Sequence, residues 1–240
     1  MFKQSRTSLL FVILMMTTGA AAQSPRSALD FLKRGNEALA KGEWASAVND
    51  FTLAIQINSG NKTAETSKQV GAVDCAEIAT SDDFNACAFC NRGLAHYKLG
   101  NLDKAIADFD RALRINPRLA DAFNNRGNVW QTKGDLDKAL TDFNQAIKLN
   151  PRHCQAFNNR ANLRQSRNDF SGAINDYSRS IELDSTNATV FANLGLTLIR
   201  LGRNDEASLN FNRALTLSPT MKDKLEELIK QERSLYLAKQ

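Results

Sequence analysis

The residue types best suited to chemistry in this sequence are its cysteines: Cys75, Cys87, Cys90 and Cys154. Four cysteines allow three complete pairings, and Cys87 and Cys90 have the Cys-x-x-Cys spacing. A redox pair with this spacing needs one thiol of depressed pKa at a helix N-terminus, within a strand-and-helix context that this chain lacks. The simpler interpretation is a structural disulfide from Cys75 to either Cys87 or Cys90.

The N-terminal segment indicates an oxidising destination for these cysteines. Lys3 and Arg6 precede an apolar run from residue 9 to 16, and small residues follow at positions 20–22. This order is typical of a secretory signal, and the run is shorter than the ~20 residues that a membrane-spanning helix needs. We expect a signal peptide at 1–22, cleavage near Ala22, and a periplasmic or secreted mature chain without a membrane anchor.

The histidines add little chemistry. His96 and His153 lack the acidic and nucleophilic neighbours of a catalytic site, and a zinc site that uses either one with the cysteines is the weaker alternative. The sequence contains no Gly-x-Gly-x-x-Gly, no Gly-x-x-x-x-Gly-Lys-Ser/Thr and no His-Glu-x-x-His motif. We therefore expect no catalytic residue, no metal site and no cofactor.

The elements that carry these residues repeat at an offset of 34 positions. In the stretch 120–151, apolar residues at helical spacing stop at Gly134 and Asp135, resume at Ala139 and end at Pro151. Each unit therefore predicts a helix, a turn and a second helix. A small residue recurs in the first helix, followed 16 positions later by an aromatic residue: Gly93 and Phe109, Gly127 and Phe143, Ala161 and Tyr177, Gly195 and Phe211.

This pattern resembles the tetratricopeptide repeat, a helix–turn–helix unit of 34 residues. An earlier copy carries Gly35 and Phe51 at the same internal positions. The resemblance implies an all-α fold, a right-handed superhelical solenoid of five units at 28–61, 86–119, 120–153, 154–187 and 188–221. Because no such unit can bury its apolar face alone, stability must come from stacking.

Two segments depart from the period. Residues 62–85 are polar and small and predict an inserted loop, which a disulfide from Cys75 would tie to the second unit. Residues 222–240 carry leucines among charges and predict a C-terminal capping helix over the last unit. Cys154 lies two units further on, and since neighbouring helices pack ~8 to 10 Å apart, we expect it to stay free.

Amide side chains dominate the first helices of the middle units. In this family the first helices line the concave side of the solenoid, so the resemblance implies a peptide-binding groove that contains Asn91, Asn124, Asn128, Gln131, Asn158, Asn162 and Gln165. An amide both donates and accepts hydrogen bonds, so a ladder of amides can hold the main chain of an extended peptide. The alternative for each amide is a hydrogen bond to a neighbouring helix or to water.

One subgroup of the family binds the C-terminal carboxylate of chaperones through Lys, Arg and Asn residues. Its asparagines match Asn36 and Asn91, but its basic positions fall on Leu32, Asp121 and Asn125, so this partner is disfavoured. A further set of arginines recurs in the first helices, and we expect these side chains to pair with nearby carboxylates or stack on neighbours: Arg34, Arg92, Arg126 and Arg160.

The nearly balanced charge of the chain does not favour nucleic acid, so a protein partner is the main expectation. Without residues 1–22 the chain has 29 basic and 26 acidic residues, which gives no argument for nucleic acid. The resemblance implies a non-enzymatic scaffold or adaptor that binds a peptide or partner protein. The first alternative is a structural subunit of a stable envelope complex, joined through its convex face or last helix. A thiol-disulfide enzyme is the second alternative and rests on the Cys-x-x-Cys motif alone.

Overall fold

The computed structural model describes residues 27–60 and 80–237, and this part of the chain forms α-helices and one short 3-10 helix, without a β-strand. The described residues do not include the predicted signal peptide, Cys75, most of the predicted loop or residues 238–240. The helices are α1 (Ala28–Lys41), α2 (Trp44–Gly60), α3 (Ser81–Lys98), α4 (Leu102–Ile115), α5 (Ala120–Lys133), α6 (Leu136–Leu149), α7 (Cys154–Ser166), α8 (Phe170–Leu183), α9 (Ala188–Arg200), α10 (Asn204–Leu217) and α11 (Lys222–Leu237).

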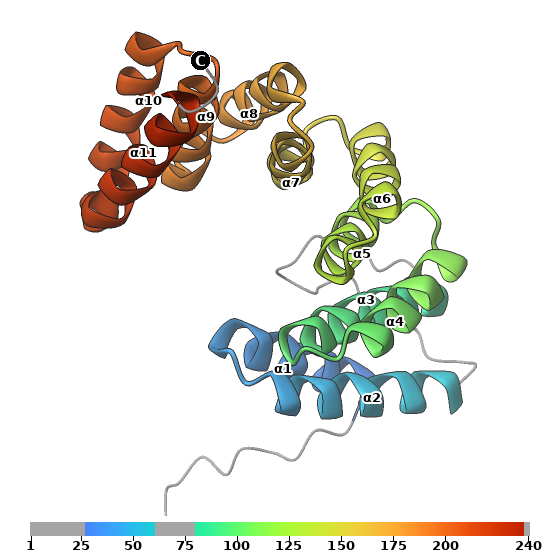
Figure 1. Cartoon of the computed structure of the whole chain (residues 1–240). Helices are drawn as coiled ribbons and strands as arrows, with labels where there is room; N and C mark the ends of the chain where they lie inside the picture. Colours follow the sequence, from blue (N-terminus) through green and yellow to red (C-terminus); the bar gives the residue numbers. More distant parts are fainter. Residues whose placement is uncertain (1–26, 61–79, 238–240) are drawn as a thin grey trace, which may run out of the picture.

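Consecutive helices pair, and the pairs stack into a superhelical solenoid, which confirms the predicted fold class (Figure 1). Each of the five pairs from α1·α2 to α9·α10 is one helix–turn–helix unit. The turn inside the third unit shows how the chain reverses. Gly134 adopts a left-handed φ of 84°, and its amide donates to the carbonyl of Gln131 at 3.0 Å. Glycine takes this conformation without the steric cost that a Cβ brings.

Helix α3 begins earlier than the repeat period predicts, so residues 81–85 are helical and do not belong to the inserted loop. The hydroxyl of Thr80 accepts from the amide of Asp83 at 3.1 Å and caps the helix. The side-chain amide of buried Asn58 donates to the carbonyl of Ser81 at 3.0 Å. These contacts fix the helix start one turn and a half before the predicted unit boundary.

Within a unit, the aromatic residue of the second helix lies against the small residue of the first. A Cβ built on Gly127 would meet Cε1 of Phe143 at 2.6 Å, and Phe143 is fully buried. The same contact recurs between glycine and phenylalanine in the first, second and fifth units. The fourth unit uses Ala161 with Tyr177 instead, and both side chains are fully buried.

The recurring arginines tie helices together, which confirms that they pair with carboxylates and stack on aromatic neighbours. The guanidinium of Arg126 donates from Nε and Nη2 to the two carboxylate oxygens of Asp142, each at 2.8 Å. It also lies over the ring of Phe123, 5.4 Å from the centroid. Equivalent pairs join the two helices of three other units: Arg34 with Asp50, Arg92 with Asp108, and Arg160 with Asp176.

The same arginines also reach back to the preceding unit. Nη1 of Arg126 donates to Asp110 at 2.6 Å, and Nη1 of Arg160 donates to Asn144 at 2.7 Å. Arg92 makes the corresponding contact with Thr52 at 3.0 Å. Each of these three arginines therefore connects three helices in two units.

The predicted capping helix is present as α11, which follows the 3-10 turn Pro219–Met221. Leu225 is 2 % exposed and belongs to the same apolar cluster as residues of α8, α9 and α10. None of the described helices is both long and apolar enough to cross a membrane.

Candidate functional site

We call the first-helix positions that carry the predicted amides the groove face. In α5 these positions hold Asn124, Asn128 and Gln131, in α7 Asn158, Asn162 and Gln165, and in α9 Ala192, Leu196 and Ile199. Spacings of four and three residues place each set on one side of its helix. The groove face is therefore uncharged throughout, polar along α5 and α7 and apolar along α9.

Two of the predicted groove residues lie inside the stack. Asn91 and Asn124 are each 2 % exposed. The amide of Asn91 donates to Asn36 of the first unit at 2.8 Å, and Asn124 accepts from Asn159 of the fourth unit at 2.9 Å. These amides satisfy one another between units, since a buried amide without a partner is costly. For Asn91 and Asn124 the hydrogen bond to a neighbouring helix is the interaction observed.

The other predicted amides are partly exposed. Asn128, Gln131, Asn158, Asn162 and Gln165 are all of intermediate burial. Asn158 donates to Asn159 at 3.4 Å, while its own carbonyl oxygen is buried and has no hydrogen-bond partner among the described residues. Within the same described part, the side chains of Asn128 and Gln131 make no hydrogen bond, so their donors and acceptors remain available.

Tyr177 orients two of these amides from behind. Its hydroxyl lies 2.6 Å from Oδ1 of Asn162 and 2.8 Å from Oε1 of Gln165. A phenol has one proton to donate, and Oδ1 of Asn162 already accepts from Asn193 at 3.1 Å. The hydroxyl therefore lies between the side-chain oxygens of Asn162 and Gln165 and donates its single proton to one of them at a time. Burial raises the pKa of Tyr177, so this donor stays protonated.

The consequence is that both side-chain oxygens are engaged, while the amide nitrogens of Asn162 and Gln165 make no hydrogen bond among the described residues. Amide nitrogens without a partner can donate to the carbonyl groups of an extended chain. Both residues line a pocket of about 330 Å³ together with Ser166, Asn168 and Arg200. The positive charge of Arg200 is already paired with Glu232 of α11.

The repeat sequence alone did not indicate Tyr177. It occupies the aromatic position of the second helix, where a core role accounts for the residue type. The signal that distinguishes it is the single change from phenylalanine to tyrosine among the five units, which adds a hydroxyl that must find a partner when buried.

The cysteines do not form an active pair. Cys90 is a free thiol, so the predicted alternative of a disulfide from Cys75 to Cys90 is wrong. Cys90 lies in the apolar core, where burial raises its pKa to about 12, the reverse of what a reactive thiol needs. Cys154 is free, as predicted. Cys87 is buried beside Asn91, and its predicted partner Cys75 lies outside the described residues.

The histidines have packing partners. Nε2 of His153, the residue before α7, lies 3.0 Å from the carboxylate of Asp121 in α5. Nε2 of His96 lies 3.9 Å from Asp108, and burial lowers the pKa of His96. No group of three or more His, Cys, Asp or Glu side chains that could hold a metal ion occurs among the described residues.

Comparison with known families matches the repeat units directly. Models of the tetratricopeptide repeat match residues 86–119, 120–153 and 188–221, and a further model of this repeat type matches residues 161–202. Together they cover more than half of the chain. A comparison with curated proteins finds no match.

Solved structures with the same fold are similar over most of the chain. TTC0263, a thermophilic TPR protein from Thermus thermophilus, has a TM-score of 0.62 and 18% identity, covering 86% of this chain and 98% of that one. MamA from Desulfovibrio magneticus RS-1 has a TM-score of 0.59 and 15% identity, covering 80% and 96%. YrrB, a TPR protein described as having an unusual peptide-binding site, has a TM-score of 0.53 and 18% identity, covering 80% and 87%. Identities this low establish the shared fold.

Proposed function

The chain belongs to the tetratricopeptide repeat family and is a protein-interaction scaffold. We propose that it acts as a non-enzymatic adaptor and holds an extended segment of another protein. The proposed binding surface is the groove face of α5 and α7. The observation that carries this proposal is the pair of oriented amides at Asn162 and Gln165, continued by the unbonded amides of Asn128 and Gln131.

The chemistry of this surface defines the ligand class. Uncharged amides recognise the main chain and select weakly among side chains, so the ligand is an extended peptide without a required charge. The similar fold of YrrB, a protein described as having a peptide-binding site, supports a peptide as the ligand. Asn124 supports the surface from within, because its hydrogen bond with Asn159 joins the two units that carry it.

A selected peptide gives the sharpest test. A displayed library of random 12-residue peptides is selected for binding to the wild-type chain, and the peptide with the highest affinity is labelled for fluorescence anisotropy. The fourfold variant Asn128→Ala/Gln131→Ala/Asn162→Ala/Gln165→Ala should bind at least about tenfold more weakly, since each lost hydrogen bond contributes about 0.5–1.5 kcal/mol.

The matched control changes four exposed polar residues of the second helices, Lys104→Ala/Thr141→Ala/Asn175→Ala/Ser208→Ala. It should bind like the wild type. Equal affinity of the groove variant and the control variant would exclude the amide surface as the binding site.

Export and one disulfide complete the proposal. A signal peptide at 1–22 would deliver the chain to the periplasm or the medium, and N-terminal sequencing of the mature protein should then start at Gln23. There, Cys75 and Cys87 would form a disulfide that ties the segment after α2 to α3. Digestion under non-reducing conditions should yield a Cys75 peptide linked to a Cys87 peptide, and detection of both as free thiols would contradict it.

A structural subunit of a stable envelope complex is the second candidate. The observation in its favour is apolar exposure away from the groove face: Leu209 on α10 and Leu237 on α11 are each 70% exposed. If this candidate is correct, Leu209→Ser/Leu237→Ser should shift the native chain from a large complex to a smaller size in gel filtration of the envelope extract. An unchanged elution volume would remove this candidate.

A further inference from the structure

Helix α11 breaks the stacking order of the solenoid. Of the two helices in the unit before it, every earlier first helix packs mainly on the second: α3 on α2, α5 on α4, α7 on α6 and α9 on α8. Helix α11 packs mainly on α9, the first helix of the last unit, and lies beside the last pair in Figure 1. The 3-10 turn Pro219–Met221 lies between α10 and α11. The helix is thus placed against the side of the unit that elsewhere forms the groove.

The groove face changes character where α11 covers it. Ala192, Leu196 and Ile199 are 5%, 7% and 1% exposed, at the positions where α7 presents partly exposed amides. They share one apolar cluster with Leu225, and Leu228 and Ile229 pack against that cluster. The α11 residues have the i, i+3, i+4 spacing of an amphipathic helix laid on an apolar surface.

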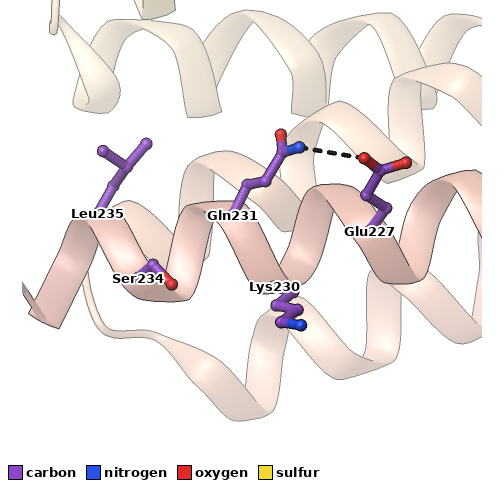
Figure 2. Close-up of a pocket in the computed structure, with 5 residues that line it drawn as sticks. All are labelled: Glu227, Lys230, Gln231, Ser234 and Leu235. Atoms are coloured by element: carbon purple, nitrogen blue, oxygen red, sulfur yellow. Dashed lines mark hydrogen bonds between the residues drawn. The ribbon is translucent and has the colours of Figure 1, made fainter.

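A charge pair sets the register of the two helices. Arg200, at the end of α9, forms an ion pair with Glu232 of α11 through Nε and Nη2, and both side chains are largely buried. Glu232 follows Leu225 by seven residues and lies on the same side of α11. The opposite side is exposed and mostly polar. Five of its residues line a pocket of about 590 Å³ and are drawn as sticks in Figure 2: Glu227, Lys230, Gln231, Ser234 and Leu235.

We propose that the apolar groove face of α9, with Arg200 at its end, is a binding site for an amphipathic helix, and that α11 occupies this site in the resting chain. The partner it fits has apolar residues at i, i+3 and i+4 and an acidic residue at i+7, as α11 itself has. Leu225 is the one fully buried side chain of α11, so a partner helix has little to displace. The bound helix would lie next to the pocket at Asn162 and Gln165, since Arg200 borders both.

The test uses α11 as its own probe. A fluorescein-labelled peptide of residues 219–240 is titrated with the full chain by anisotropy. The wild-type chain should bind it weakly, because its site is filled. In the chain with Leu225→Asp/Ile229→Asp, which we call the detached chain, α11 loses its central apolar anchor and leaves the site. This chain should bind the peptide at least about tenfold more tightly than the wild type, because the site is then open.

Two controls separate the site from a general effect. The chain with Gln231→Asp/Ser234→Asp adds the same charge on the opposite side of α11 and should behave like the wild type. The peptide carrying Leu225→Asp/Ile229→Asp should not bind any of the chains. Failure of the detached chain to gain affinity over the wild type, at unchanged helix content by circular dichroism, overturns the proposal.

A second variant tests the same proposal with a smaller disturbance of the fold. Glu232→Arg faces Arg200 with a like charge and leaves the apolar contacts in place, so it should give an intermediate gain in peptide binding. If neither this chain nor the detached chain gains affinity, the proposal is wrong. The amide variant of the proposed function should bind the peptide like its parent, so the two proposals succeed or fail separately.

Discussion

Removal of Arg126 should cost far more stability than removal of Arg126 together with Asp142. Arg126 donates to both carboxylate oxygens of Asp142 at 2.8 Å, and the Asp142 side chain is 5% exposed. In Arg126→Leu, that carboxylate loses its partner in a place where water cannot replace it. Breaking a buried pair in this way costs about 3–5 kcal/mol, and we expect about 3 kcal/mol because Arg126 itself is at the edge of the core.

The fifth unit supplies the compensating change. It holds Leu194 and Asn210 at the positions of the arginine and the aspartate, so this combination is already compatible with the fold. The double variant Arg126→Leu/Asp142→Asn removes the stranded charge and should lose only about 1 kcal/mol, mainly from the lost contact with Asp110. The coupling energy of the two changes should then be about 2 kcal/mol or more.

Urea titration measures these differences. Far-ultraviolet circular dichroism follows all helices, and tryptophan fluorescence reports on the first and third units, which contain Trp44 and Trp130. Coincident transitions justify conversion of midpoints to free energies, a necessary check for a repeat protein. A double variant as unstable as the sum of the two single variants would refute the reasoning, because it would show that the pair contributes nothing as a pair.

Three further outcomes follow from single sites. Cys90, whose pKa burial raises to about 12, should resist iodoacetamide at pH 8 in the native chain while Cys154 reacts, and mass spectrometry after unfolding provides the reference. Gly127→Ala should destabilise by about 1–3 kcal/mol in urea, because its Cβ would meet the buried ring of Phe143 at 2.6 Å, whereas Ala107→Gly on an exposed position should cost about 1 kcal/mol at most. Burial lowers the pKa of His96, so the unfolded chain binds the proton more readily than the folded chain. The stability of the fold should therefore decrease as the pH drops below about 6.5. His96→Gln should reduce this decrease, measured as the change in the urea midpoint between about pH 7.5 and 5.5.

The solenoid was predictable because repetition gives the same information several times. Gly127 and Phe143 specify a close helix pair, and their copies in other units remove the ambiguity of a single pair. The start of α3 was not predictable from the period. Its position depends on Thr80 as a cap and on the contact of Asn58 with Ser81, and both Thr80 and Ser81 lie before the repeat unit that the period places at residue 86.

The candidate site was predictable only in part, because identical residue types serve two purposes. Asn124 and Asn128 lie four residues apart on one helix, yet Asn124 is buried between units and Asn128 is partly exposed. The difference depends on how closely the neighbouring unit approaches, which is a tertiary distance. The position of α11 escaped prediction for a related reason: its leucines indicate that it covers apolar surface, but not which helix supplies that surface.

The arginine contacts between units also determine how such a chain can grow. Each arginine requires a polar residue on the second helix of the unit before it, as Arg126 finds Asp110 and Arg160 finds Asn144. A duplicate of the third unit inserted after residue 153 would place a second Arg126 beside Asn144, and a second Asn144 beside Arg160. Both arginines would then contact an asparagine, as Arg160 already does. Gene duplication at this point would therefore lengthen the solenoid by one unit without requiring a new kind of contact. A duplicate of the fifth unit, with Leu194 at the arginine position, would bring no such junction.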